Sequence, residues 1–313
     1  MKRIHVMAGV IRDPNGRILL ARRPDHAHQG GLWEFPGGKR EQEESRRQAL
    51  GRELREELGI EVRNARPLID IRHDYPDKSI RLDVWQVDAF DGEPHGAEGQ
   101  PVRWVSESEL SEYQFPKANE PILKAARLPD TYLITPDLQP GKALLEGIQR
   151  ALDRGVRLIQ LRQTQLSADQ YLQQAEWIAQ CCAGRALLML KGDLPPEIPG
   201  TGWHLTARQL LALDTAIADG RFPPRPAGLL AASCHNPAEL AAAARVGVDF
   251  VTLSPVLPTS SHPGAPTLGW ARAAEWISET NLPVYLLGGL GADHRAQAWE
   301  HGAQGIAGIS ALW

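Results

Sequence analysis

The residues best suited to chemistry lie in one stretch, residues 38–60, which reads G-x5-E-x7-R-E-L-x-E-E-x-G-I. At about 100° of rotation per helical residue, Glu53, Glu56 and Glu57 fall within one sector of roughly 100°. The leucines of the same stretch form an apolar stripe beside it. Three like charges so close together repel one another unless a positive group lies among them. Mg²⁺ prefers oxygen ligands and usually keeps water and substrate phosphates in its shell, so the pattern predicts a magnesium site that handles phosphates.

The competing interpretation is a solvated helix laced with ion pairs. Arg46, Arg47, Arg52 and Arg55 are spaced to pair with the acids. The large number of fixed positions favours the metal site, because short motifs match by chance far more often. Gly59 is expected to end the helix as its C-cap.

The stretch resembles the Nudix hydrolase signature at every fixed position. The wider resemblance to MutT-type Nudix hydrolases covers nearly all of residues 1–128. Outside the signature it is carried by residues 22–23, 25–28, 34–39, 92–94, 98–101 and 115–121. It implies hydrolysis of a nucleoside triphosphate to the monophosphate and pyrophosphate, with 8-oxo-dGTP as the preferred substrate. Such an activity removes oxidised nucleotides before DNA replication. Another purine nucleotide is the alternative substrate.

The resemblance also implies roles for individual residues. Mg²⁺, with Mn²⁺ as an alternative, would be held by the carbonyl of Gly37 and by Glu53, Glu56, Glu57 and Glu98. Glu53 would act as general base or orient the attacking water, and Arg52 would position Glu53 or Glu56 through a bidentate pair. The nucleotide would contact Arg23, His28, Glu34, Phe35, Pro36, Gly37, Lys39, Lys78 and Asn119. Without the resemblance, Arg23, Lys39 and Glu98 would be interpreted as solvated surface charges.

Asn119 has two interpretations. Pro121 follows it by two positions, which is typical of a helix N-cap. Alternatively, its carboxamide recognises the base, because oxidation at C8 turns N7 of guanine from an acceptor into a donor. An amide oxygen would bond that donor and meet an opposing lone pair on normal guanine. Phe35 would supply an apolar wall. Lys78 and Tyr75 stand where close relatives often have arginine and phenylalanine, and lysine cannot form a planar fork of two hydrogen bonds.

These residues must be positioned by strands and at least one long helix. Residues 80–84 alternate apolar and polar with period two, as a half-buried strand does. Further strands are expected at 5–10, 18–21, 68–72 and 102–105, a turn at 91–92, and a short helix from about 119–121. Mixed strands with segregated helices predict an α+β fold, an α/β/α sandwich around a mixed sheet.

Beyond a short linker at 128–130, apolar strands alternate with helical patterns through 131–313. Strands are expected at 132–135, 157–161, 186–190, 203–205, 229–232, 250–253, 284–287 and 305–309. Helices are expected at 141–154, 168–182, 207–217, 237–246, 268–280 and 292–301. Eight strands in this alternation predict a (β/α)8 TIM-type barrel, and no residues remain after the eighth strand for its last helix.

The second half resembles the thiamine phosphate synthase and TenI family. The resemblance is carried by residues 132–135, 160–162, 233–236, 254–260, 288–290 and 308–310. It implies that a phosphorylated ligand is bound by Gln160, Arg162, Thr259, Gly288, Gly289 and Ser310. Thr164 and Lys191-Gly192 stand where synthases carry a basic residue and an Asn-Asp pair, and an acid is missing from residues 206–209. Synthase activity therefore looks lost. A thiazole tautomerase with His235 as catalytic residue, or a non-catalytic module for phosphate ligands such as thiazole or thiamine phosphate, both remain. A structural role for His235 is the alternative at that residue.

The bulk composition excludes several classes of protein. The 313 residues are 42% hydrophobic and 23% charged, with a mean hydropathy of −0.32 and no apolar run long enough to span a bilayer. Residues 1–128 carry 21 basic and 22 acidic side chains, and the remainder 13 and 16. Neither half is basic, which argues against a polynucleotide partner. Three cysteines, two of them adjacent, give no disulfide framework and indicate a reducing cytoplasm. The oligomeric state is left open.

Overall fold

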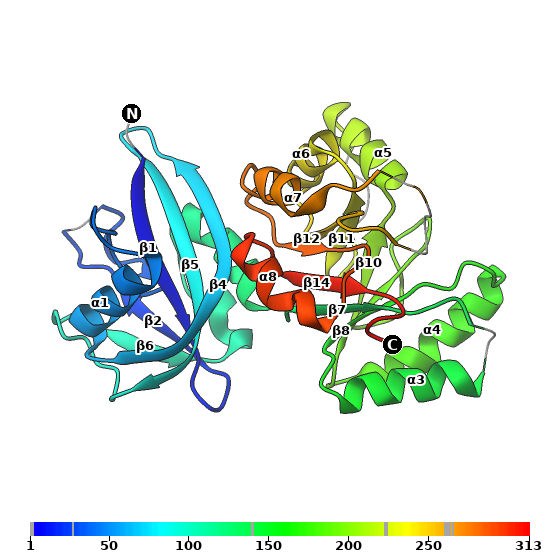
Figure 1. Ribbon diagram of the computed structural model, residues 1–313, viewed down its shortest axis with the longest axis horizontal. Helices are drawn as coiled ribbons and strands as arrows, with labels where there is room; N and C mark the ends of the chain where they lie inside the picture. Colours follow the sequence, from blue (N-terminus) through cyan, green and yellow to red (C-terminus); the bar gives the residue numbers. More distant parts are fainter. Residues whose placement is uncertain (1–2, 27, 139–140, 222–224, 260–263, 265) are drawn as a thin grey trace. The chain divides into compact units, whose positions relative to one another are not determined.

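The computed structural model describes residues 3–26, 28–138, 141–221, 225–259, 264 and 266–313. Ala27 and Ser260, which belong to segments that carry the two resemblances, lie outside the described residues. The chain divides into two compact units, Met1–Arg127 and Leu128–Trp313, and each is described by itself (Figure 1).

The first unit contains two three-stranded sheets. Their strands are β1 (Ile4–Ile11), β2 (Ile18–Arg22), β3 (Trp33–Glu34), β4 (Glu61–Asp74), β5 (Ser79–Asp91) and β6 (Val102–Val105). One sheet has the order β1-β5-β4, with β1 parallel and β4 antiparallel to β5. The other has the order β3-β2-β6 and is antiparallel. The predicted mixed sheet is confirmed.

Two α-helices pack into separate core clusters of this unit. Helix α1 (Arg46–Leu58) buries its leucine stripe against residues such as Met7 and Ile11. Helix α2 (Glu120–Ala126) buries Ile122 and Ala125 in the second cluster. Two short 3₁₀ helices, η1 (Glu107–Glu112) and η2 (Lys117–Asn119), precede α2. The leucine spacing read from the sequence therefore sets which face of α1 points away from the core.

The hairpin of β4 and β5 is longer than the sequence pattern predicted. Only residues 80–84 alternate cleanly in sequence. Register shifts near Val62 and Asn64 and between Pro67 and Ile69 interrupt the period-two pattern of β4. The predicted turn at 91–92 is wrong in part: Asp91 still pairs with Glu61, so it ends β5.

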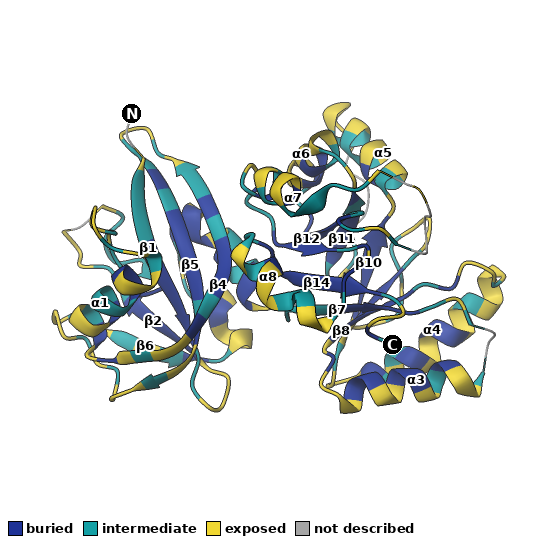
Figure 2. Cartoon of the chain, in the orientation of Figure 1, coloured by how far each residue is buried: buried dark blue, intermediate teal, exposed yellow. Residues whose placement is uncertain are grey.

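The second unit is a closed barrel of eight parallel strands. They are β7 (Thr131–Ile134), β8 (Leu158–Leu161), β9 (Leu187–Leu190), β10 (Thr201–Leu205), β11 (Leu230–Cys234), β12 (Phe250–Leu253), β13 (Val284–Leu286) and β14 (Gly305–Gly308). Tyr132, Phe250 and Tyr285 pack edge-on or tilted against one another and belong to one fully buried cluster. Outward-facing side chains form the larger cluster beneath the helices, and Figure 2 shows the strands dark blue under helices whose outer faces are exposed. The predicted barrel is confirmed.

The barrel helices are α3 (Lys142–Asp153), α4 (Ala168–Cys182), α5 (Ala207–Ala218), α6 (Pro237–Val246), α7 (Gly269–Ile277) and α8 (Arg295–Glu300), the last preceded by η3 (Ala292–His294). No helix lies between β9 and β10 or after β14 in the part of the chain that the structure describes. Residues after β14 pack back instead: Leu312 joins the core, and Trp313 covers Gly147 of α3.

Residues 128–130, expected to be a linker, are part of the barrel unit. Leu128 is buried in the interior cluster, and its carbonyl accepts a hydrogen bond from Gln304. The Tyr285 hydroxyl donates to the carbonyl of Pro129. Among the helices described, none is long and apolar enough to cross a membrane. All three cysteines carry free thiols.

Candidate functional site

Helix α1 is fixed at both ends by local sequence. Ser45 caps the N-terminus in a reciprocal capping box with Gln48. Gly59 ends the helix in the left-handed conformation, at φ 71°, as its spacing predicted. The acidic face of the last two turns is thereby held beside residues 36–40.

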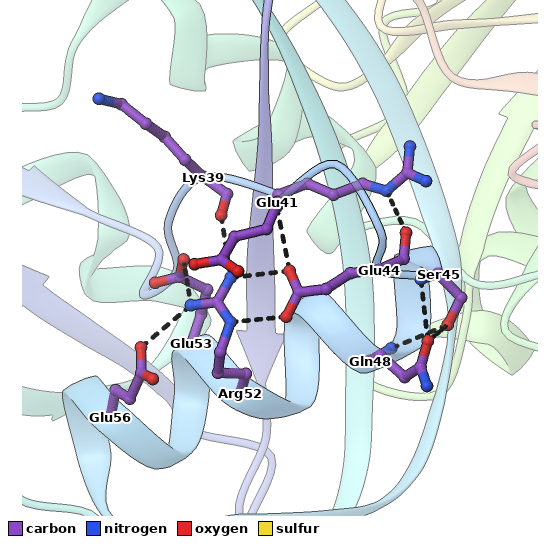
Figure 3. Close-up of polar contacts among 9 residues, drawn as sticks. Lys39, Glu41, Glu44, Ser45, Gln48, Arg52, Glu53 and Glu56 are labelled. Atoms are coloured by element: carbon purple, nitrogen blue, oxygen red, sulfur yellow. Dashed lines mark hydrogen bonds and ion pairs between the residues drawn. The ribbon is translucent and has the colours of Figure 1, made fainter.

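Arg52 is the centre of a polar cluster on α1 (Figure 3). It forms a bidentate pair with Glu44, with N···O distances of 2.6 and 2.9 Å. Its Nη1 also donates to Glu53 at 2.8 Å and to Glu56 at 3.0 Å, and its Nη2 donates to the Lys39 carbonyl. The bidentate partner is therefore Glu44, whereas the sequence predicted Glu53 or Glu56. The hydrogen bond from Arg52 lowers the pKa of Glu44 to about 2.

The loop at Gly37 and Gly38 lies directly on the acidic face. Its backbone follows β1, since Gly9 N–H donates to the Pro36 carbonyl and Met7 N–H to the Gly38 carbonyl. Gly37 N–H donates to Glu57 Oε2 at 2.7 Å. Gly37 has φ 148°, and a Cβ there would lie 2.1 Å from the Met7 carbonyl oxygen. The close approach therefore requires glycine.

Repulsion among the carboxylates of this face disfavours their ionised forms. Burial is the main cause that raises the pKa of Glu57 to about 7; the charges of Glu34 and Glu98 contribute to the rise, and the hydrogen bond from Gly37 opposes it. Burial also raises the pKa of Glu53, which Arg52 opposes, and the carboxylate lies against Gly38. Glu56 is about half exposed. Oxygen donors that repel one another fit a hard divalent cation.

Within the described ranges, no three His, Cys, Asp or Glu side chains form a ready-made metal cage. Arg52 accounts for this on α1, because it binds both Glu53 and Glu56. The backbone N–H of Gly37 similarly occupies one oxygen of Glu57. The fit to a cation therefore rests on the donor chemistry and the mutual repulsion of the acids, and Mg²⁺ characteristically binds through one or two carboxylates plus phosphates and water.

Asn119 is 7% exposed. It precedes α2, but its side chain makes no capping hydrogen bond, and its carboxamide bonds to no residue that the structure describes. Asn119 thus occupies the N-cap position that the sequence predicted, but its side chain does not cap α2. Phe35, 4% exposed, stacks on Phe115 with ring centroids 5.8 Å apart. A buried amide without a partner is costly unless a ligand completes it.

The other expected nucleotide contacts form a second group. Tyr75 packs edge-on against His28 and His73, and the Lys78 ammonium lies 5.6 Å from its ring centroid. Arg23 is already engaged: it pairs with Glu34 and donates to the His28 carbonyl.

Lys39 differs from Arg23. Its side chain is exposed and extends away from the Arg52 cluster in Figure 3. Unlike Arg23, its ammonium forms no ion pair with any residue that the structure describes.

The barrel carries a cavity of about 420 Å³ after β13 and β14. Its lining includes Thr259, Gly288, Gly289 and Ser310. Gly288 and Gly289 have φ values of 104° and 67°, and a Cβ at Gly289 would lie 2.5 Å from the Pro258 carbonyl. Four of the six ligand residues expected from the sequence therefore line one cavity.

The remaining two lie on β8 and just after it. Gln160 is buried at 7% exposure. Arg162 donates to Asp137 at 3.0 Å, and the same carboxylate accepts bonds from the backbone and hydroxyl of Thr164 at 2.6 and 2.9 Å. Arg162 is thus neutralised within the chain.

His235 follows β11. Its Nδ1 lies 3.0 Å from Glu239 Oε2, and its backbone N–H donates to the same oxygen. Asn236 caps α6 by accepting the Glu239 N–H, and its side-chain amide also donates to the Glu239 carboxylate. The carboxylate fixes the orientation of the ring, which suits a base at Nε2 and also suits a structural histidine.

Sequence reasoning missed Glu44, Gln100 and Asp137. Glu44 occupies a fixed position of the signature, which was the available signal for its role. Gln100 lies in the segment 98–101 that carries the resemblance, but nothing in the sequence showed its contact with Glu57. Asp137 gave no signal, because its importance comes from contacts with residues distant in sequence.

Comparison with known proteins covers both units. A family model described as a NUDIX domain matches residues 7–125, and one described as thiamine monophosphate synthase matches residues 131–312. The chain is 42% identical over 123 residues to the 8-oxo-dGTP diphosphatase of Escherichia coli (strain K12), covering 39% of this chain and 95% of that protein. Both resemblances inferred from the sequence are confirmed.

Two further relatives bear on the substrates. The CTP pyrophosphohydrolase of Escherichia coli (strain K12) is 44% identical over 125 residues, covering 40% of this chain and 92% of that protein. The thiamine-phosphate synthase of Methanosarcina barkeri (strain Fusaro / DSM 804) is 27% identical over 194 residues, covering 58% of this chain and 82% of that protein.

Proposed function

Because the chain belongs to the NUDIX family over residues 7–125 and to the thiamine monophosphate synthase family over residues 131–312, we propose that it is a two-unit enzyme whose first unit hydrolyses a nucleoside triphosphate. The products are the monophosphate and pyrophosphate, and the preferred substrate is 8-oxo-dGTP. The observation that carries the hydrolysis is the packing of Glu53 and Glu57 against the Gly37–Gly38 backbone. We place the reaction in the cytoplasm.

Hydrolases of this family generally need a divalent metal, and we propose Mg²⁺, which Mn²⁺ can replace. Glu56, Glu57, Glu98 and the carbonyl of Gly37 would hold it, with Glu53 in contact or adjacent. When bound, the cation supplies positive charge that offsets the charge developing on the leaving pyrophosphate.

The chain's own groups do the rest. Glu53 takes the proton from the attacking water, since burial raises its pKa while Arg52 keeps it oriented. Lys39 contacts a phosphate oxygen. Water adds to phosphorus, the anhydride bond breaks, and the bond electrons leave on pyrophosphate.

The placement of Asn119 favours an oxidised purine as the base of the substrate. The amide oxygen accepts the N7–H that 8-oxoguanine has and guanine lacks, and Phe35 contributes an apolar wall. The test is a substrate panel on the full chain, with the nucleotide product and pyrophosphate identified. Release of orthophosphate in place of pyrophosphate would exclude the proposed reaction.

A cytidine triphosphate is the second candidate, because a CTP pyrophosphohydrolase is as similar to this unit as the diphosphatase. The same panel separates the two: kcat/KM for CTP above that for 8-oxo-dGTP would favour the pyrimidine. Ordinary and other oxidised purine triphosphates belong in the panel too.

For the barrel we propose binding of a small phosphorylated ligand, such as a thiazole or thiamine phosphate, in the cavity with Gly288 and Gly289. Synthase activity is not part of the proposal, since Asp137 neutralises Arg162 and Lys191-Gly192 stand in place of the Asn-Asp pair. In thiazole tautomerase chemistry, Glu239 would orient the ring of His235 for a base at Nε2. Calorimetry of the full chain with each phosphate tests binding, and a tautomerase assay of His235→Asn tests catalysis.

A further inference from the structure

The loop that carries Glu98 has no helix or strand of its own between residues 92 and 101. Glu98 is exposed, so packing of its side chain does not fix its position. Its negative charge and that of Glu57 repel each other. Something other than secondary structure must therefore hold the two acids together.

Three hydrogen bonds tie this loop to the last turn of α1. His95 N–H donates to the Leu58 carbonyl at 3.1 Å, and Ala97 N–H donates to the Glu57 carbonyl at 3.0 Å. Gln100 Nε2 donates to the Glu57 carbonyl at 2.9 Å. A helix leaves its last four carbonyls without helical partners, and the loop satisfies two of them.

Gln100 differs from His95 and Ala97 because its side-chain amide both donates and accepts a hydrogen bond. While Nε2 donates to Glu57, Oε1 accepts the backbone N–H of Glu98 at 3.0 Å. One carboxamide thus joins the backbones of both acidic residues. The turn around it is tight: a Cβ at Gly96 would lie 1.8 Å from the Gln100 carbonyl oxygen, and Gly99 has φ 84°.

We propose that Gln100 is a positioning residue whose carboxamide holds Glu98 at the end of α1, so that Glu57 and Glu98 face the same cation. The inference rests on the proposed function, in which both acids are cation ligands. Both ends of the amide are required. Glutamate lacks the N–H donor and brings a negative charge to the Glu57 carbonyl, and alanine lacks both groups.

The test measures Mn²⁺ binding to the full chain without nucleotide, by electron paramagnetic resonance of free Mn²⁺. Gln100→Ala and the isosteric Gln100→Glu are expected to raise the dissociation constant about 10- to 100-fold, as losing an outer partner of a metal ligand does. The Mg²⁺ concentration for half-maximal hydrolysis rises in parallel, while kcat at saturating Mg²⁺ changes less.

Gln86→Ala is the matched control. The Gln86 amide also bonds at both ends, accepting from Arg66 at 3.0 Å and donating to Asp88 at 2.6 Å. Its loss should leave Mn²⁺ affinity unchanged. Circular dichroism and melting temperature establish that each variant is folded. If Gln100→Ala does not fold, Gln100→Glu decides.

Glu98→Gln separates this inference from its premise. Weaker Mn²⁺ binding by Glu98→Gln with wild-type binding by both Gln100 variants overturns the role of Gln100 and leaves the proposed hydrolysis standing. Wild-type Mn²⁺ binding by Glu98→Gln overturns the metal assignment of Glu98, and the role of Gln100 with it.

Discussion

At the residue scale, the account depends on carboxylates that cannot all be solvated. Arg52 partly compensates their charge, because one guanidinium binds Glu44, Glu53 and Glu56. Removing Arg52 would release Glu56, a candidate metal ligand, and Glu53, the residue proposed as general base. The effects of single substitutions in this cluster are therefore not additive.

Glu53→Gln should lower kcat by at least about 100-fold, since an amide cannot accept the proton of water. Steady-state kinetics with saturating Mg²⁺ check this, with an unchanged melting temperature as evidence of folding. Glu112→Gln, an exposed acid of the same unit, is the control. Turnover by Glu53→Gln within a few-fold of the control would remove Glu53 from the mechanism.

Asn119→Ala should reduce the preference for 8-oxo-dGTP over dGTP by about 10- to 100-fold, the usual range for losing a buried hydrogen bond to a ligand. Stability should change little, because the amide makes no capping bond to α2. The ratio of the two kcat/KM values is the measurement. Equal losses on both substrates would exclude Asn119 from base recognition.

At the element scale, periodicity predicted most of the fold. Helix α4 begins and ends where the sequence pattern placed it, as does strand β12, because both have clean periods and clear flanking residues. The ends of β4 and β5 were missed because bulges and Pro67 interrupt their alternation. Strand β3 was missed because two residues carry no period.

The candidate site was predictable only in part. The signature located the acids of α1 and, through the glycine pair, the backbone that lies on them. The sequence could not show that Arg52 forms its bidentate pair with Glu44. Nor could it show that Asp137 neutralises Arg162, since both pairs depend on side-chain geometry in the folded chain.

Trp313→Ala should lower the free energy of unfolding of the barrel by about 1–3 kcal/mol, less than full burial of a large aromatic side chain would give. The indole lies against Gly147 of α3, where a Cβ would meet it at 1.9 Å, and it packs against the barrel core. Faster hydrogen exchange of the α3 amides and a lower melting temperature check this. Trp177→Ala, 46% exposed on α4, should have a much smaller effect. Equal effects of the two substitutions would contradict the packing role.

At the level of the whole molecule, acid should destabilise the barrel unit through one buried histidine. The barrel interior contains His204, whose Nδ1 lies 2.9 Å from the Tyr132 hydroxyl and whose Nε2 lies 3.0 Å from Ser233 Oγ. Burial lowers the pKa of His204 from 6.5 to about 4. Between these values the unfolded chain binds a proton that the folded barrel excludes, so stability falls as pH falls.

Protonation of His204 should lower the free energy of unfolding of the barrel by on the order of 3 kcal/mol between pH 7 and pH 4. His204→Gln removes the titration, so the difference in stability between wild type and variant should shrink by that amount on acidification. Calorimetry of the full chain at several pH values measures it, with the barrel transition identified by its shift in Trp313→Ala. A difference that stays constant from pH 7 to pH 4 would show that His204 is not buried and neutral.

The central claim is that the first unit hydrolyses an oxidised purine nucleoside triphosphate to its monophosphate. The most direct test is steady-state kinetics of the full chain with Mg²⁺ on 8-oxo-dGTP and dGTP, with CTP alongside and all products identified. We expect 8-oxo-dGMP and pyrophosphate as products, with kcat/KM for 8-oxo-dGTP well above that for dGTP or CTP. Equal or lower kcat/KM for 8-oxo-dGTP than for dGTP or CTP would contradict it.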